Sequence, residues 1–588
     1  MNTRTPCRGS RWGKNINEQR QSQTVKPKGV LTLKGPHRPH KNTSPFPVPC
    51  YIPDMVDQYD QAGLIRSLRD PTAYGHAVDS VTVIETHISS VLLAGEYAYK
   101  IKKPVDLGFV DFSTLEKRLL FCNEEIRLNR RLAPSLSLGV VPVTGTPSRP
   151  WMDGSGPAIE YAVKMRRFPQ ECMADRLLEQ DRIPPERMDE LAGTVAAFHR
   201  TCPRAGAETA YGSPAVIGNY MLQNFDHLAG AGETESDSRA IAALRDWTLA
   251  ELERCAWLIE QRRTDGFVRE CHGDLHLGNV ALIDDQLVIF DCIEFNPELR
   301  WIDVMSEVAF MAMDLEDRRK PAYAARFLNR YLETTGDYEG ISLLRFYMTY
   351  RAMVRAKVRW LLANQPCLDR AASLQAKEQS LAYLRLAERY AAQRRPALLI
   401  THGLSGSGKT FFTQTVLEAL EAVRIRSDME RKRLFQIEPT ARAGPGIAAG
   451  IYGKAAGDRT YGRLAELATV ILKAGWPVIV DATFLEQERR DHFRQLAQEN
   501  NAPFLILDLQ ASEAVLRDRL RGRSREGTDA SDADIAILEE QIRQYRPLTA
   551  EEKEFALVID TGKVSAEDTA RSIKKRLAPG ETVRPALE

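Results

Sequence analysis

Three oxygen-bearing side chains flank two short apolar runs near the middle of the chain. Asp274 and Asn279 precede residues 280–283, and Asp291 follows residues 287–290. The polar residues between the runs predict a tight hairpin, which brings the three side chains into one corner. One carboxylate can orient an attacking hydroxyl, while an amide oxygen and a second carboxylate can hold magnesium beside phosphates. The spacing predicts phosphoryl transfer, with Asp274 as the base and Asn279 and Asp291 as metal ligands.

A lysine far upstream can complete such a site. Residues 80–86, 91–93 and 97–102 are rich in β-branched and aromatic residues and predict three strands. Ala98 and Lys100 share one face of the third strand, because side chains alternate along a strand. On that face, Ala98 could pack against an adenine ring, and the Lys100 ammonium group could contact the nucleotide phosphates.

The helix predicted after these strands offers a glutamate partner for Lys100. Ser113 with Glu116 three residues later has the pattern of a capping box, which predicts the helix start. The partner is Glu124 or Glu125. We favour Glu125, because it precedes a leucine on the inward side of the helix.

His272-Gly-Asp274 stands where protein kinases have His-Arg-Asp, and His276 follows. This variant resembles the aminoglycoside and choline phosphotransferase branch of the kinase-like fold. The resemblance implies a two-lobed, ATP-dependent enzyme, with an N-lobe over about 78–168 and an α-rich C-lobe over about 169–393. It also implies that Asp303 braces the catalytic loop. His276 is expected to support that loop, and Glu294 to touch either metal or substrate.

The loop expected between the first two strands, residues 86–90, has no glycine-rich sequence. Phosphotransferases of this branch often cover the phosphates with a serine-containing loop, so the departure fits that branch and disfavours a protein kinase. The resemblance leaves Ser89 and Ser90 as candidate phosphate contacts.

The last third of the chain carries a second nucleotide motif. A buried strand is predicted over residues 397–402, and a helix through residue 422. Between them stands a P-loop in its required setting, with the residues Gly403, Leu404, Ser405, Gly406, Ser407, Gly408, Lys409 and Thr410. Inward backbone N–H groups would hold the β phosphate, Lys409 would bridge the β and γ phosphates, and Thr410 would bind magnesium.

Further candidate residues follow the P-loop in order. Asp428 and Arg431 lie one helical turn apart, so Asp428 could accept a hydroxyl proton while Arg431 holds an anionic group. Asp481 ends a buried strand at the Walker B position of a metal ligand. Arg519 and Arg523 belong to an arginine-rich helix end that suits a lid over ATP phosphates. A solvated helix face and a nucleic-acid patch are the alternatives for these arginines.

The second set of motifs, over about 397–560, resembles the small P-loop kinases: gluconate kinase, the 5′-hydroxyl kinase of polynucleotide kinase, and zeta toxin relatives. Ser427-Asp428-x-x-Arg431 is most similar to the polynucleotide kinase version, and Arg519, Arg523 and residues 529–533 recur in the group. In this group the residue at Asp481 can contact substrate instead of metal, so both roles stay open.

Composition limits the class of protein. With 588 residues, a net charge of +1 and 27% charged residues, the chain exceeds one core and shows no global charge that favours nucleic acid or membranes. No apolar run approaches the ~18 residues that span a bilayer. Nine cysteines without a CxxC pair indicate reduced thiols and a cytoplasmic location. Residues 1–50 hold ten Lys or Arg and one acid, which predicts a disordered basic leader.

Taken as a whole, the chain resembles a bacterial fusion of an aminoglycoside phosphotransferase-like domain with a P-loop kinase-like domain. The expected organisation is a leader over 1–55, an α+β two-lobed kinase-like domain over 56–393, an α/β P-loop domain with a parallel sheet over 394–580, and a tail over 581–588. Both domains are expected to use ATP and Mg²⁺ to phosphorylate a hydroxyl of a small molecule. The alternatives are that one domain only regulates the other, or that the P-loop domain phosphorylates nucleic-acid 5′ ends. The sequence does not predict the acceptor or the oligomeric state.

Overall fold

The computed structural model describes residues 60–108, 110–232, 234–365, 368–392, 395–438, 453–526 and 535–577, without the side chains of 523–526. The predicted leader, the tail and the domain boundary at 393/394 lie outside these residues. All of the described residues belong to one compact unit. None of the described helices has the length and apolar character needed to cross a membrane.

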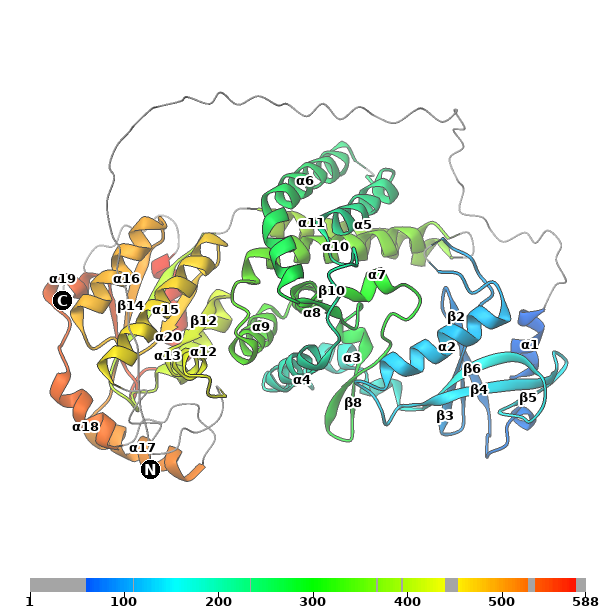
Figure 1. The fold of residues 1–588 in the computed structure, drawn as a ribbon, viewed down its shortest axis with the longest axis horizontal. Coiled ribbons are helices and arrows are strands. Elements are labelled where there is room, and N and C mark those ends of the chain that lie inside the picture. The colour runs from blue at the N-terminus through cyan, green and yellow to red at the C-terminus, as the bar shows by residue number, and fades with distance from the viewer. Residues whose placement is uncertain are drawn as a thin grey trace, which may run out of the picture. The chain divides into compact units, whose positions relative to one another are not determined.

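The first part of the described chain is an antiparallel sheet of six strands in the order β1-β2-β3-β6-β4-β5 (Figure 1). Its strands are β1 (Val81–Glu85), β2 (Ser89–Ala94), β3 (Tyr97–Lys102), β4 (Ser137–Thr146), β5 (Arg149–Met152) and β6 (Ala158–Arg166). The helices of this part are α1 (Gln61–Ser67), η1 (Pro71–Ala73) and α2 (Leu115–Asn129). Helix α2 packs against β4 and β6, and so stands beside the strand that carries Lys100.

Helix α2 begins one residue later than predicted. Thr114 is its N-cap and accepts a hydrogen bond from the backbone N–H of Lys117. Ser113 is not the cap, because its hydroxyl donates to Asp111 over 2.6 Å.

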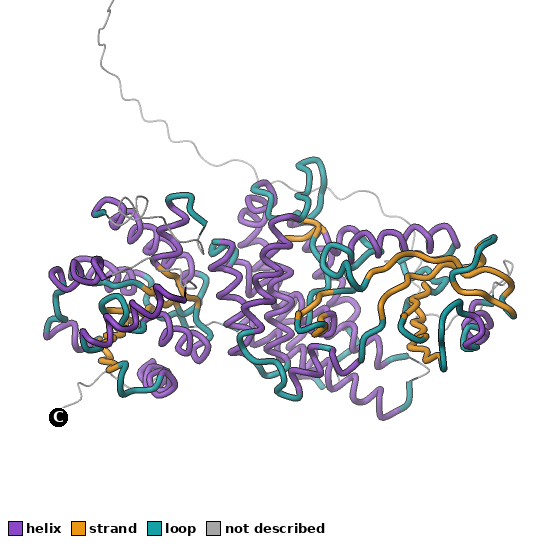
Figure 2. Tube along the Cα trace, turned by 90° about the horizontal axis from the view of Figure 1, so that it is seen from below, coloured by secondary structure: helices purple, strands orange, loops and turns teal. Residues whose placement is uncertain are grey.

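The second part is mostly helical (Figure 2). Its helices are η2 (Gln170–Cys172), α3 (Ala174–Glu179), α4 (Arg187–Thr201), α5 (Pro214–Leu228), α6 (Glu235–Thr264), η3 (Leu277–Asn279), α7 (Pro297–Arg300), α8 (Val304–Asp317), α9 (Pro321–Thr335), α10 (Ile341–Ala363) and α11 (Arg370–Ala391). Two small antiparallel pairs lie among them, β7 (Val268–Glu270) with β10 (Trp301–Asp303) and β8 (Val280–Ile283) with β9 (Gln286–Ile289). Helix α8 is apolar over most of its surface and runs through the core of this part.

Strands β8 and β9 form the predicted hairpin, with a turn one residue shorter than expected. Gln286 pairs with Ile283 within the sheet, so only Asp284 and Asp285 remain in the turn. Both aspartates have positive φ, 49° and 61°. Two such residues form the tight turn that matches the twist of a hairpin.

The third part is a parallel sheet of five strands in the order β12-β13-β11-β14-β15. The strands are β11 (Leu398–His402), β12 (Val423–Arg426), β13 (Val478–Asp481), β14 (Phe504–Gln510) and β15 (Ala556–Asp560). The helices are α12 (Lys409–Leu420), α13 (Ser427–Leu434), α15 (Lys454–Lys473), α16 (Gln487–Glu499), α17 (Glu513–Glu526), α18 (Ile535–Gln544), α19 (Ala550–Glu554) and α20 (Ala566–Leu577).

Helices cover both faces of this sheet. Leu399 packs in the core formed with α12 and α20, whereas Leu398 and Ile400 belong to the core that includes α15 and α16. A strand buried on both faces has to be apolar at successive positions, which explains the continuous apolar run of β11. Because the five strands of the sheet are parallel, their carboxyl ends meet at one edge of the sheet, where the P-loop begins.

Helix α9 contacts the edge of this sheet. The Asn329 side chain donates to the carbonyl of Ala422 over 2.8 Å and accepts from the backbone N–H of Arg424 over 2.6 Å. It therefore satisfies backbone hydrogen-bonding groups at the edge strand β12. Glu333, one turn further along α9, pairs with the Arg424 guanidinium at 2.8 Å. Arg424 also donates to the carbonyl of Thr410 over 3.2 Å, which connects α9 to the helix that follows the P-loop.

Candidate active sites

The loop before β8 places the proposed base against the proposed metal-binding amide. Asn279 Nδ2 donates to Asp274 Oδ2 over 3.1 Å and to the Asp274 carbonyl over 2.9 Å. His276 Nε2 lies 3.3 Å from the same carboxylate, and His276 Nδ1 accepts from the Gly278 backbone N–H over 3.1 Å. Burial raises the pKa of Asp274, but His276 and Arg355 outweigh it and hold that pKa well below its usual range. Asp274 is therefore a carboxylate at neutral pH.

Backbone hydrogen bonds to one buried glutamate hold this loop. Glu307 Oε1 on α8 accepts from the backbone N–H groups of His272 and Gly273 over 2.7 and 2.8 Å. His199 Nε2 lies 2.7 Å from Glu307 Oε2, and His199 Nδ1 lies 2.9 Å from the Tyr331 hydroxyl. Both imidazole nitrogens of His199 are thus engaged by protein groups. Glu307 and His199 therefore orient the loop and do not form an open metal site.

The expectation that Asp303 braces the catalytic loop is wrong. Asp303 binds the guanidinium of Arg262 through both carboxylate oxygens, at 2.7 and 2.8 Å, and Asp337 binds the same guanidinium from its other side. Asp303 is also the N-cap of α8. The brace is Glu307, one turn into that helix, because the helix itself points this side chain at the loop.

We call the site of Asp274, Asn279, Asp291 and Lys100 the front site. Its two halves meet at Lys100. Its Nζ lies 2.6 Å from Asp291 Oδ1 and 2.9 Å from Glu125 Oε1. Burial lowers the pKa of Lys100, but Asp291 and Glu125 raise it well above its usual value, so Lys100 is an ammonium ion. Asp291 adjoins the loop of Asn279, since the backbone N–H of Phe290 donates to the Asn279 carbonyl over 3.0 Å. The choice of Glu125 over Glu124 agrees with these distances.

A second lysine, Lys102, also binds Glu125. Its Nζ lies 2.6 Å from Glu125 Oε2, pairs with Glu294, and lies 4.8 Å from the centroid of the Phe112 ring. Lys102 has no exposed surface, whereas 13% of the Lys100 side chain is exposed. Lys102 therefore anchors Glu125 from behind, and Lys100 faces the site. Glu294, expected to touch metal or substrate, is committed to Lys102 instead.

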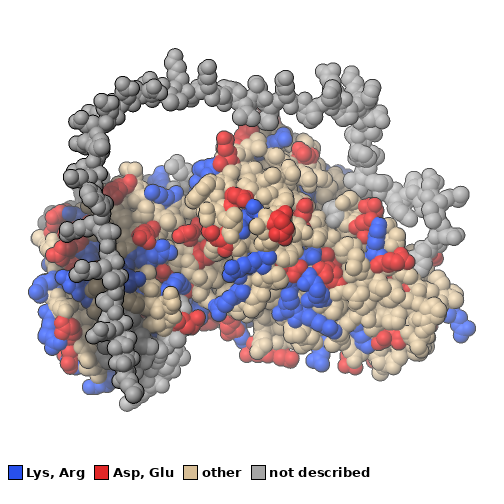
Figure 3. Space-filling model, in the orientation of Figure 1, with Lys and Arg blue, Asp and Glu red and all other residues tan. Residues whose placement is uncertain are grey.

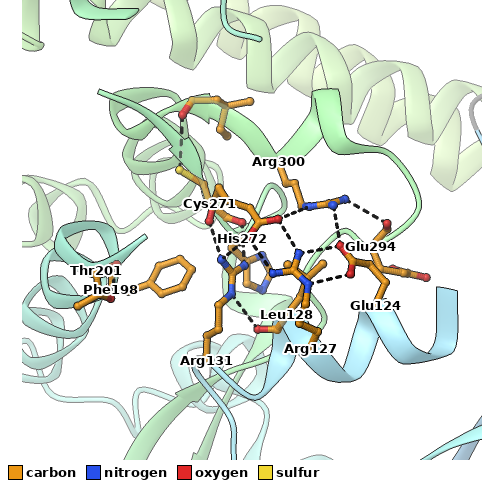
Figure 4. Close-up of polar contacts among 12 residues, drawn as sticks. Glu124, Arg127, Leu128, Arg131, Phe198, Thr201, Cys271, His272, Glu294 and Arg300 are labelled. Carbon is orange, nitrogen blue, oxygen red and sulfur yellow. Dashed lines mark hydrogen bonds and ion pairs between the residues drawn. The ribbon is translucent and has the colours of Figure 1, made fainter. Parts of the chain in front are cut away.

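Three arginines fasten α2 to the strand before the catalytic loop (Figure 4). Arg127 and Arg300 each bind both Glu124 and Glu270. Arg131 donates to the backbone carbonyls of Glu270 and Cys271, over 2.8 and 3.3 Å. Because α2 carries Glu125, this network sets the position of Glu125 relative to the catalytic loop.

Ser89 and Ser90 do not form a loop over the site. Both are buried within β2, and Ser90 Oγ donates to Glu85 over 2.9 Å. The loop between the first two strands is shorter than predicted, because Ser89 and Ser90 already pair with β3. The expectation of phosphate contacts from these serines is wrong for this structure.

The P-loop turns back on itself through three glycines with positive φ. Gly403, Gly406 and Gly408 have φ of 146°, 87° and 89°. A Cβ at Gly403 would lie 2.5 Å from a backbone oxygen of β14, and one at Gly406 would lie 2.9 Å from a backbone oxygen of α17. Only glycine fits such close approaches of backbone to backbone. The tight loop lies next to the N-terminus of α12, whose positive end suits an anion.

The side chains of the P-loop region suit a bound phosphate and a cation. Thr410 Oγ1 donates to Asp481 Oδ2 over 2.8 Å, which places the hydroxyl and the carboxylate where both could contact one metal ion. Lys409 Nζ lies over the loop, 3.1 and 2.9 Å from the carbonyls of Gly403 and Leu404. Ser407 Oγ is buried and has no hydrogen-bond partner among the described residues, a group that a phosphate oxygen would satisfy. The backbone N–H of Ser405, also a predicted residue, donates to Gln541 Oε1 over 2.8 Å.

The remaining predicted residues of the P-loop part are placed as follows. Arg431 donates to Asp428 Oδ1 over 3.2 Å, at the start of α13 and next to the end of β12. Arg519 on α17 donates to the Gly406 carbonyl over 3.2 Å, so it touches the P-loop as a lid residue would. The Arg523 side chain and residues 529–533 lie outside the described residues.

Sequence reasoning missed Lys102, Glu307 and Gln541. Lys102 follows Lys100 by two residues and so shares its strand face, which was a usable signal. Glu307 and Gln541 act through backbone N–H groups far away in the chain. No spacing in the sequence marks such contacts.

Two family models match the chain. Residues 122–344 match the model of the phosphotransferase enzyme family, and residues 398–548 match that of an AAA domain. The chain thus joins a phosphotransferase domain of the kinase-like fold to a P-loop kinase-like domain, which confirms the resemblance and the fold class predicted from the sequence. Both matches support phosphoryl transfer of the kinase type and the binding of nucleotide.

Among curated relatives, an uncharacterized protein of Mycobacterium tuberculosis (strain H37Rv) is 29% identical over 471 residues, which cover 79% of this chain and 91% of the relative. An uncharacterized protein of Mycobacterium bovis has the same identity and coverage. The similarity therefore extends over both domains.

Solved structures match each part of the chain separately. Amicoumacin kinase in complex with AMP-PNP and Ca²⁺ is 12% identical, covers 56% of this chain and 94% of its own, and has a TM-score of 0.36. A choline/ethanolamine kinase family protein from Mesorhizobium loti is 11% identical, covers 56% and 98%, and has a TM-score of 0.34. A gluconokinase from Sinorhizobium meliloti is 19% identical, covers 32% and 93%, and has a TM-score of 0.22. At this level of similarity they carry no information on substrate.

Proposed function

We propose that the protein is an ATP- and Mg²⁺-dependent phosphotransferase with two nucleotide sites, each transferring the γ-phosphoryl group to a hydroxyl of a small molecule. The observation that carries the proposal is the contact of Lys100 with both Glu125 and Asp291. It joins the phosphate-directed lysine, its helix partner and a candidate metal ligand in one place.

At the front site, Asp274 would accept the proton of the acceptor hydroxyl as its oxygen attacks the γ phosphorus. The new O–P bond forms while the bond to the β,γ-bridging oxygen breaks, and ADP leaves. The oxygens of Asn279 and Asp291 fit the preference of Mg²⁺ for hard ligands, and 46% of the Asp291 side chain is exposed and open to a cation. Bound magnesium would neutralise phosphate charge. Lys100 would orient the α and β phosphates.

At the P-loop site, inward N–H groups and Lys409 would bind the β and γ phosphates, and Thr410 with Asp481 would hold magnesium. Asp428 is the proposed base, and the contact from Arg431 keeps its carboxylate oriented. Arg519, which already touches the P-loop, would stabilise the transferring phosphoryl group.

The test is ATP turnover in the full chain carrying Asp274→Asn, Lys409→Ala, or both. Two active sites predict that each single variant removes one component of turnover and of nucleotide-analogue binding, while the double variant removes both. If Lys409→Ala abolishes all turnover but leaves nucleotide bound at the front site, the P-loop domain regulates the front domain instead. If neither variant lowers turnover or binding, the proposal is wrong.

A further inference from the structure

Three arginines form a stripe on α10, spaced one helical turn apart: Arg351, Arg355 and Arg359. Residues four apart lie on one helix face, so the three guanidinium groups follow one another along it. Arg351 NH1 donates to the Gly273 carbonyl over 3.2 Å, next to Asp274. The stripe therefore begins at the catalytic loop and leads away from it.

The first arginine is explained by the loop itself. Besides the Gly273 carbonyl, Arg351 donates to the carbonyl and the hydroxyl of Ser306, over 3.3 and 3.1 Å. Its guanidinium lies 4.9 Å from the centroid of the Phe310 ring. Arg351 is a positioning residue that is fully engaged by protein groups.

The next two arginines are less fully engaged, and Tyr383 is the main protein partner of Arg355. Arg355 and Arg359 are half-buried, and within the described part of the chain neither forms an ion pair with a carboxylate. Arg355 stacks over Tyr383, 5.7 Å from the ring centroid, but its Nε is buried and accepted by no described group. A buried guanidinium donor that no protein group accepts is costly, and an anionic ligand would satisfy it.

Nearby carboxylates of the described residues do not pair directly with these arginines. Asp314 accepts from the backbone N–H of Leu277 over 3.0 Å and from Arg318 over 3.1 Å. Burial raises the pKa of Asp317, and within the described residues no ion pair joins Asp317 to Arg355 or Arg359. A guanidinium donor thus remains available on this side of the catalytic loop.

The Asp274 carboxylate faces this charge. Arg355 is near enough to contribute to its lowered pKa, and 38% of the Asp274 side chain is exposed, so a solvent-borne acceptor can reach it. A hydroxyl placed at Asp274 would leave the remainder of the acceptor beside Arg355 and Arg359.

We infer that the acceptor of the front site carries an oxyanion, a carboxylate or a phosphate ester, close to its reacting hydroxyl, and that Arg355 and Arg359 bind this group. Guanidinium groups match carboxylate and phosphate geometry, and a cationic acceptor would be repelled. The inference rests on the proposed phosphotransferase function of the front domain. It assigns Arg355 and Arg359 as specificity-determining residues.

Direct anion binding tests the inference first. Sodium sulfate is titrated calorimetrically into full-length Lys409→Ala protein, at constant ionic strength, with and without Arg355→Gln or Arg359→Gln. The matched control is Arg385→Gln, which removes the same charge from an exposed position on α11. We expect Arg355→Gln to weaken sulfate binding by about tenfold or more, as loss of a charge-assisted hydrogen bond does. Equal sulfate affinity in Arg355→Gln and Arg385→Gln would overturn the inference.

Phosphoryl transfer then identifies the kind of anion. The same proteins receive labelled ATP with glycerol, glycerate, glycerol 3-phosphate or choline, four hydroxyl compounds that differ in charge. Labelling of glycerate or of glycerol 3-phosphate, with a KM about tenfold higher in Arg355→Gln and a nearly constant kcat, supports the inference and separates carboxylate from phosphate. Labelling of glycerol or choline alone, abolished by Asp274→Asn, would overturn it and leave the proposed function standing. Absence of ATP binding at the front site would instead refute the proposed function.

Discussion

Two lysines of β3 bind the same glutamate, and replacing each by methionine should have opposite consequences. Lys102 is fully buried between Glu125 and Glu294, so Lys102→Met leaves the buried Glu294 carboxylate without its cation, while Glu125 keeps Lys100. Removing one partner of a buried ion pair costs about 3–5 kcal/mol. In a domain of this size that lowers the unfolding temperature by on the order of 10 °C.

Lys100→Met should change stability much less. Glu125 keeps its bond to Lys102, and the carboxylate released at Asp291 is 46% exposed and can be solvated. Loss of such a partly exposed pair costs about 0–1 kcal/mol. Catalysis at the front site should instead fall by at least about a hundredfold, because the ammonium group that contacts phosphate is gone.

Thermal unfolding followed by circular dichroism, together with ATP turnover in a Lys409→Ala background, measures both effects. Lys103→Met is the matched control, since Lys103 pairs with Glu85 at the surface and should affect neither property. Lys102→Met with Glu294→Met should regain part of the lost stability, because an apolar pair replaces the buried charges. The assignment is refuted if Lys102→Met stops turnover at unchanged stability while Lys100→Met unfolds the domain.

Three further perturbations test the sites. His276→Asn should raise the pKa of Asp274, because His276 no longer offsets the effect of burial on that carboxyl group. The acid limb of the pH profile of kcat/KM for the front site should then move to higher pH. An unmoved limb would contradict this electrostatic role. Gly403→Ala should abolish nucleotide-analogue binding at the P-loop in calorimetry, since its φ is 146° and a Cβ would meet a backbone oxygen at 2.5 Å; retained affinity would contradict the tight loop. Asp481→Asn should raise the Mg²⁺ concentration for half-maximal turnover, given the contact with Thr410, whereas a raised acceptor KM at unchanged Mg²⁺ dependence would show a substrate contact.

The expected residues of the front site come from three separate segments, and the structure brings them into contact. Lys100, Glu125 and Asp291 meet directly, as do Asp274 and Asn279. Their catalytic and metal-binding roles remain predictions. The expectations for Asp303, Ser89 and Ser90 failed for one reason: each depended on a partner that only the folded chain selects.

The sequence by itself determined the two classes of domain and the fold class. Their signals are local, since a P-loop needs its glycines, lysine and threonine consecutively, and a hairpin needs two apolar runs with a turn between them. Tertiary structure decided which lysine faces the site, that Glu307 holds the catalytic loop, and that Arg355 lies near Asp274. These assignments depend on burial and on contacts between distant segments, which are properties of packing and leave no periodic or spaced pattern in the chain.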